Sequence, residues 1–249
     1  MRHCLIFAIT MKKLNSYLRK IAAGIVVLMA TAFMLTPTAP TPASDAVSQT
    51  VTTPASLYQQ LNLKQLGLNA TAYNLAVKGW QKMKAKGEVS KDIISICDFT
   101  QSSTQKRLYI IDMANGKLLF NTLVAHGKNT GEEFARYFSN EPQSLKSSLG
   151  FYATGATYNG QHGLSLKLNG EEPGFNSNAE SRAIVMHGAD YVTNDFVSEC
   201  GCGRLGRSFG CPAIPYAISD KLINTIKDGT CLFIYYPDSK YLASSKLLK

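Results

Sequence analysis

The sequence predicts a mainly β fold, an antiparallel β-sandwich or a partly open barrel, with a few helices and an N-terminal helical extension. Three observations support this class. Short apolar runs typical of strands dominate the chain after residue 93. Helical segments do not alternate with them, so the βαβ rhythm of a parallel sheet is absent. Asn115-Gly116 separates two of the runs, as in a type I′ β-hairpin.

The first 43 residues are typical of a secretory signal. A basic stretch over 12–20 precedes an apolar run of 15 residues, 21–35, and small residues and prolines follow. We therefore expect a signal peptide over 1–43 and an exported protein of the periplasm or cell envelope. The run is shorter than the roughly 20 apolar residues of a membrane span. The alternative is an uncleaved segment that associates transiently with the membrane.

Without that segment, 206 residues remain, which suit one compact domain. We expect a Ser/Thr/Ala/Pro-rich linker over 44–55, the helical extension over 56–89 and the main domain over 90–249. The remaining 21 basic and 17 acidic residues give a charge of +4. No Lys/Arg cluster with interleaved aromatics occurs, which excludes nucleic acid as the expected partner.

The elements follow from local patterns. A short helix is expected over 57–61, and a firmer one begins at Asn69 or Thr71 and ends at Gly87 with one apolar stripe. Tyr158-Asn159-Gly160 is predicted to turn between two strands. The expected strands are 93–97, 107–113, 117–125, 150–157, 163–168, 183–186 and 230–236, and a helix is expected over 216–227.

Two separated motifs carry the chemistry. Ser208-Phe209-Gly210-Cys211-Pro212 frames a cysteine with glycine, and Met186-His187-Gly188 places a histidine after an upstream strand. A thiolate is the reactive form of cysteine, and a nearby imidazole takes its proton and later returns it to a leaving amine. Cys211 and His187 therefore predict acyl transfer.

These motifs resemble the murein L,D-transpeptidase (YkuD-type) catalytic domain family, whose pattern is His-Gly, a spacer and Ser-x-Gly-Cys. The resemblance covers roughly residues 90–237. It implies an L,D-transpeptidase fold and a transferase of cell wall biogenesis that acts on peptidoglycan stem peptides. In this family a cysteine thioester forms with release of D-alanine, and an amine then takes the acyl group.

The resemblance also implies roles for individual residues. Cys211 matches the family nucleophile and His187 the base, with the Gly188 carbonyl orienting the imidazole. Ser208 and Gly210 match the remaining catalytic motif positions. We expect the amides of Gly210 and Cys211 to point at the developing oxyanion.

The substrate-binding candidates are weaker. The family usually carries an arginine shortly after the cysteine, where this chain has Pro212 and Ala213, so Arg204 or Arg207 is the expected replacement. His126 and His162 lie near strand ends and are candidates to line the substrate cleft, against a structural or merely exposed histidine at each position.

Five cysteines follow the signal segment. Cys97 and Cys231 lie in apolar runs and are expected to be buried thiols. The pairing of Cys97, Cys200, Cys202 and Cys231 stays open. Cys200-Gly201-Cys202 lacks the usual spacing of a zinc site, so we expect neither a metal site nor a cofactor.

Three other functions remain as alternatives. An L,D-carboxypeptidase or endopeptidase, a hydrolase, would deliver the same acyl group to water. A noncatalytic wall-binding module would keep the fold but would not need the Cys211–His187 pair. A metal-binding or redox protein rests on Cys200-Gly201-Cys202 alone.

Overall fold

An eight-stranded sheet forms the centre of the computed structural model, which describes residues 54–249. The predicted signal peptide and most of the predicted linker lie outside the described residues. The strands are β1 (Ile93–Asp98), β2 (Leu108–Asp112), β3 (Lys117–Thr122), β4 (Gly150–Gly160), β5 (Gly163–Gly170), β6 (Val185–Ala189), β7 (Ala213–Pro215) and β8 (Cys231–Tyr235).

The sheet is mixed and nearly closed. Its order is β3-β2-β1-β8-β4-β5-β6-β7. The β1–β8 and β6–β7 pairs are parallel, and the other neighbouring pairs are antiparallel. An isolated antiparallel bridge from Ala125 to Ala213 joins the chain after β3 to the opposite edge at β7. The predicted mainly β class is confirmed, in its partly open barrel form.

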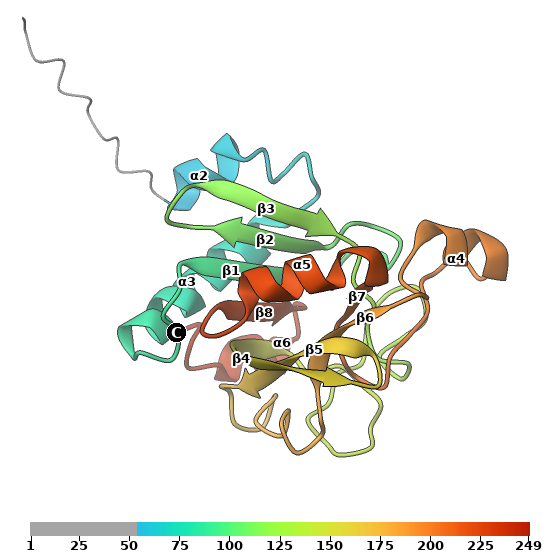
Figure 1. Ribbon diagram of the computed structural model, residues 1–249. Coiled ribbons are helices and arrows are strands. Elements are labelled where there is room, and N and C mark those ends of the chain that lie inside the picture. The colour runs from blue at the N-terminus through green and yellow to red at the C-terminus, as the bar shows by residue number, and fades with distance from the viewer. Residues whose placement is uncertain (1–53) are drawn as a thin grey trace, which may run out of the picture. The chain divides into compact units, whose positions relative to one another are not determined.

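Five helices accompany the sheet in the described residues (Figure 1): α2 (Pro54–Gln60), α3 (Ala70–Ala85), α4 (Asn194–Cys200), α5 (Tyr216–Ile226) and α6 (Ser239–Ser244). Asn69 caps α3 by accepting hydrogen bonds from the amides of Thr71 and Ala72. The α3 stripe packs on β1 and β8, and a Cβ at Gly79 would lie 2.0 Å from the Phe151 ring. The helical segment therefore shares the main core.

Two predicted turns differ in detail. In the β2–β3 hairpin only Gly116 has a positive φ, so the turn is not type I′. The Asp112 carboxylate instead accepts hydrogen bonds from the amides of Ala114 and Asn115, which stabilises a longer turn. The predicted turn over 158–160 belongs to β4, and the chain reverses at Gln161–His162 before Gly163, whose φ is +74°.

Three elements were not predicted from the sequence: α4, β7 and α6. Helix α4 buries none of its residues and projects from the side of the sheet (Figure 1). Helix α5 lies across β5, β6 and β7. None of the helices within residues 54–249 is long and apolar enough to cross a membrane.

Candidate active site

His187 lies within β6, one strand from the sheet edge. Its neighbours in register are Ser165 on β5 and Ala213 on β7. Cys211 comes two residues before Ala213, and Val185 two residues before His187, so the parallel pairing sets Cys211 beside Val185. Side chains two residues apart along a strand share a face. The sheet register therefore directs the thiol and the imidazole toward one side.

The imidazole of His187 is buried and oriented by the main chain. Its Nδ1 lies 2.9 Å from the Gly188 carbonyl oxygen, the orientation that the family resemblance implies. A carbonyl only accepts, so Nδ1 carries the proton and Nε2 presents a lone pair. A Cβ at Gly188 would lie 2.7 Å from Ser219 Oγ, so glycine allows α5 to pack closely on this strand.

A tight turn presents Cys211. Ser208 Oγ donates to the Cys211 carbonyl at 2.6 Å and accepts from the Gly210 amide at 3.1 Å. The single N–H of Gly210, one of the two amides expected to face the oxyanion, is therefore used inside the turn in this structure. The Cys211 amide is the remaining candidate. Gly210 has a φ of +130°, a conformation that a side chain would strain.

The Cys211 thiol is half-buried and is hydrogen-bonded to the main chain. The Val185 amide donates to Sγ at 3.5 Å, and Sγ lies 3.8 Å from the Ala183 carbonyl oxygen. Burial raises the pKa of Cys211, against the lowering effects of the Val185 amide and the Arg182 charge. Burial also lowers the pKa of His187. Both shifts favour a resting pair of neutral thiol and neutral imidazole.

Cys211 and His187 line the same cavity, of about 640 Å³. Its wall includes the partly exposed aromatic side chains of Tyr158 and Phe209. His162, at the tip of the β4–β5 hairpin, also lines it and stacks on His187 with ring centroids 4.3 Å apart. Burial is the main cause of the lowered pKa of His187, and the His162 imidazole lowers it further.

This arrangement agrees with the comparison with protein families. A family model described as the L,D-transpeptidase catalytic domain matches residues 64–235. The chain belongs to this family. The match begins before α3 and ends at the last residue of β8, so it includes helix α3 as well as the whole sheet.

The solved structures that are similar to this L,D-transpeptidase domain share little sequence identity with it. The L,D-transpeptidase from Mycobacterium smegmatis is 10% identical, with a TM-score of 0.36 over 58% of this chain and 59% of that one. The L,D-transpeptidase from Stackebrandtia nassauensis is 13% identical, with a TM-score of 0.35 over 70% and 73%. The chain thus spans about three fifths of the first of these structures. No curated protein matches it.

The two arginines expected to bind substrate, Arg204 and Arg207, form ion pairs with one loop residue of the transpeptidase domain. Arg204 Nε and Arg207 Nη1 both pair with the exposed Glu132 carboxylate, at 2.8 and 2.5 Å. Arg207 also donates to the main-chain oxygens of Lys128 and Gly131. Arg207 still lines the cavity, but Arg204 does not.

His126 lies in the interior of the transpeptidase domain rather than in its cleft, and only 1% of it is exposed. Arg107 Nη2 donates to its Nδ1 at 2.8 Å, so Nε2 carries the proton toward the Gly131 carbonyl at 3.2 Å. Its own carbonyl accepts from the Ser208 amide. His126 therefore supports the catalytic turn through the main chain.

Acidification is expected to destabilise the domain through His126. Burial, followed by the Arg107 charge, lowers its pKa from 6.5 to about 3. Between these values the unfolded chain binds a proton that the folded state excludes, so stability falls as the pH falls, by up to ~1.4 kcal/mol per pH unit. In urea unfolding between pH 7 and pH 4, H126Q should lose less stability than wild type. Equal losses in wild type and H126Q would contradict the assignment.

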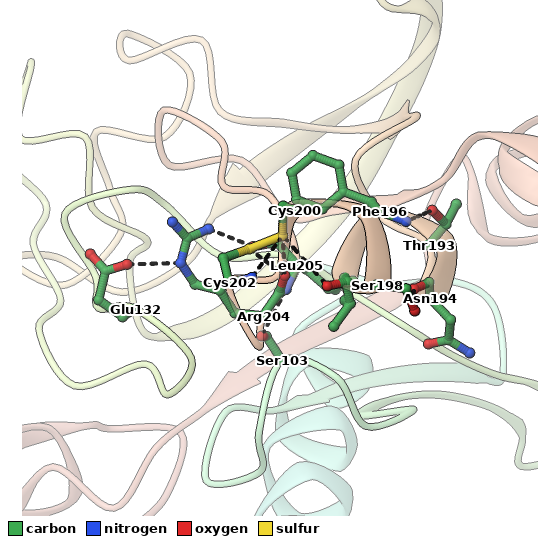
Figure 2. The surroundings of a disulfide bond; sticks show 11 residues. Ser103, Glu132, Thr193, Asn194, Phe196, Ser198, Cys200, Cys202, Arg204 and Leu205 are labelled. Atoms are coloured by element: carbon green, nitrogen blue, oxygen red, sulfur yellow. Dashed lines mark hydrogen bonds and ion pairs between the residues drawn. A yellow bond between two sulfur atoms is a disulfide. The ribbon is translucent and has the colours of Figure 1, made fainter.

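Cys200 and Cys202 form a disulfide at the end of α4 (Figure 2), which settles the cysteine pairing left open by the sequence. Cys97, Cys211 and Cys231 are free, and Cys97 and Cys231 are buried as expected. Cys202 Sγ contacts the Arg204 carbonyl, next to the Glu132 pair. Among the described residues, no group of three His, Cys, Asp or Glu side chains is placed to hold a metal.

Several cavity residues were not singled out from the sequence. Besides Tyr158 and Phe209, the wall includes Arg182. Tyr191 also lines the cavity, and its place shortly after the His-Gly motif made it a candidate from the sequence. Arg182 precedes β6 without any recognisable motif, and its contacts come from a distant segment of the chain.

Proposed function

We propose that the chain is an exported L,D-transpeptidase that forms a thioester at Cys211 with peptidoglycan stem peptides. The observation that carries the proposal is the shared cavity of Cys211 and His187, with Nδ1 of His187 bonded to Gly188 and Nε2 left to accept a proton. Family membership supports the peptidoglycan substrate. Export rests on the signal-like segment 1–43.

The proposed reaction has two halves. Nε2 of His187 takes the proton of Cys211 as Sγ attacks the carbonyl between the L-centre of the diamino acid and D-alanine. The carbon–nitrogen bond then breaks, the proton passes to the leaving amine, and D-alanine departs. An acceptor amine attacks the thioester, gives its proton to His187 and releases Cys211 as a thiol. The Cys211 amide supports the oxyanion in both halves.

The neutral resting pair suits this order of events. A neutral thiol reacts only slowly with adventitious electrophiles, because the thiolate is the nucleophilic form. The neutral imidazole is ready to act as base at neutral pH, because its lowered pKa keeps it unprotonated. The exposed faces of Tyr158 and Phe209 offer apolar contacts to an extended peptide at the cavity mouth.

The test is to incubate the mature protein, residues 44–249, with purified tetrapeptide muropeptides and to identify the products by mass spectrometry. The proposal expects 3–3 linked dimers and free D-alanine. Free tripeptide with D-alanine and no dimer would assign the enzyme as a carboxypeptidase. No product, together with an unmodified Cys211 after carbapenem treatment, would favour a wall-binding module.

A further inference from the structure

Arg182 brings a positive charge to the cavity wall beside Cys211. It lies in the segment between β5 and β6 and is half-buried. The other titratable side chains in the cavity wall are Tyr158, His162, His187, Tyr191 and Arg207, and no carboxylate lines it within residues 54–249. Arg207 is paired with Glu132, whereas Arg182 forms no ion pair in this part of the chain.

The Arg182 guanidinium is fixed by four hydrogen bonds to one segment, 139–148. Nη1 donates to the Ser139 carbonyl at 2.8 Å and to Ser148 Oγ. Nη2 donates to the Lys146 carbonyl at 2.7 Å and to Ser144 Oγ at 3.2 Å. All four terminal N–H groups are therefore used by the protein, so the group is held in place and does not itself grip a ligand through them.

The clamped segment supports the peptide that carries the nucleophile. Ser147 Oγ donates to the Gly210 carbonyl at 3.2 Å and accepts from the Gly127 amide at 3.0 Å. A Cβ at Gly210 would lie 2.9 Å from the Lys146 carbonyl oxygen and 3.3 Å from Arg182 Nη2. The segment is thus hydrogen-bonded to the Gly210 carbonyl, and the guanidinium lies at the edge of the space that a side chain at 210 would occupy.

We propose that Arg182 is a positioning residue for the reaction at Cys211. It clamps segment 139–148 under the Gly210–Cys211 peptide and holds a fixed positive charge beside the sulfur. This inference rests on the proposed role of Cys211 as nucleophile.

Negative charge develops on Sγ as the proton moves to His187 Nε2, and a fixed cation stabilises that charge without any rearrangement. The Arg182 charge acts in this direction, since it lowers the pKa of Cys211 against the larger raising effect of burial. The clamp has a separate effect, because it also holds the peptide whose Cys211 amide faces the oxyanion. A neutral residue at 182 removes both the charge and the guanidinium hydrogen bonds to segment 139–148. Lysine keeps the charge but lacks the planar guanidinium that makes those four hydrogen bonds.

The test compares R182Q, R182K and the surface control R136Q, which removes an exposed positive charge outside this cavity. Alkylation of Cys211 by iodoacetamide is followed across pH, since its rate reports the thiolate fraction. We expect the R182Q profile to move to higher pH, with slower alkylation near neutrality, because the positive charge that lowers the pKa of Cys211 is lost. R182K should keep the wild-type profile but slow acylation by muropeptide, and R136Q should match wild type in both.

A folded R182Q with wild-type alkylation and acylation would overturn the proposal. If R182Q does not fold, R182K and S148A, which removes one partner of the clamp, decide the question: wild-type acylation rates in both would overturn it equally. Alkylation requires no peptidoglycan substrate. If the wild-type protein fails to turn over muropeptides while R182Q still shifts the alkylation profile, the transpeptidase proposal is contradicted and the role of Arg182 stays intact.

Discussion

Cys211→Ala is expected to reduce the turnover of stem peptides to background. Alanine has no atom that can form the thioester, and loss of the nucleophile costs on the order of 10⁶ in rate in a comparable acyl-transfer enzyme. Iodoacetamide labelling at position 211 should vanish at the same time. The measurement is product formation from tetrapeptide muropeptides, together with intact-protein mass spectrometry after alkylation.

The matched control for C211A is C231A. Cys231 is also a free thiol, but it is fully buried in β8 and contacts the Met83 sulfur rather than the cavity. C231A should lose some stability and keep both turnover and alkylation. If C211A instead keeps most of its activity while folded, the thiol mechanism is wrong, whatever the family membership.

His187→Ala is expected to slow acyl transfer by roughly 10²–10⁴-fold, the usual contribution of a general base and acid. The imidazole must be unprotonated to take the proton of Cys211. Because burial lowers the pKa of His187, the acid limb of kcat/KM in wild type should lie below pH 6.5, the ordinary histidine value. The measurement is kcat/KM for acylation between pH 4.5 and pH 8.

The H187A variant should lose this acid limb as well as the rate, since no base titrates in the cavity at that position. Unfolding experiments at neutral pH separate the chemical effect from misfolding. A folded H187A with the wild-type rate and the wild-type acid limb would remove His187 from the mechanism and leave proton transfer to His162 or to water.

Much of the sheet was predictable because its signals are local. Alternating apolar runs and glycine-containing turns identified all the strands except β7, which is only three residues long and directly follows Pro212. Helix α4 was missed because it is short, lies inside the spacer between the two motifs and buries no residue that would produce an apolar stripe. The N-cap at Thr193 was the signal available for it.

The site was predictable only where one motif carried a whole function. Cys211 and His187 could be assigned from their neighbours in the chain. The interior position of His126 could not be predicted. Its partner is Arg107, an arginine that is itself fully buried, and no local sequence pattern predicts a buried arginine. The arginines of the cavity wall show the same limit. Proximity in sequence pointed to Arg204 and Arg207, of which Arg207 lines the cavity, whereas the place of Arg182 in the same wall depends on tertiary contacts with segment 139–148.

The oxidation state of the cysteines has a practical consequence. Cys200 and Cys202 are bonded to each other, and Cys97 and Cys231 are sealed in the core. Once residues 1–43 are absent, a mild fluorescent maleimide should attach to the native protein at a 1:1 stoichiometry, through one sulfur. Labelling with the same reagent then measures the fraction of molecules in a preparation that have a free Cys211 thiol. A carbapenem or peptide that occupies the site can be quantified by the decrease in labelling that it causes.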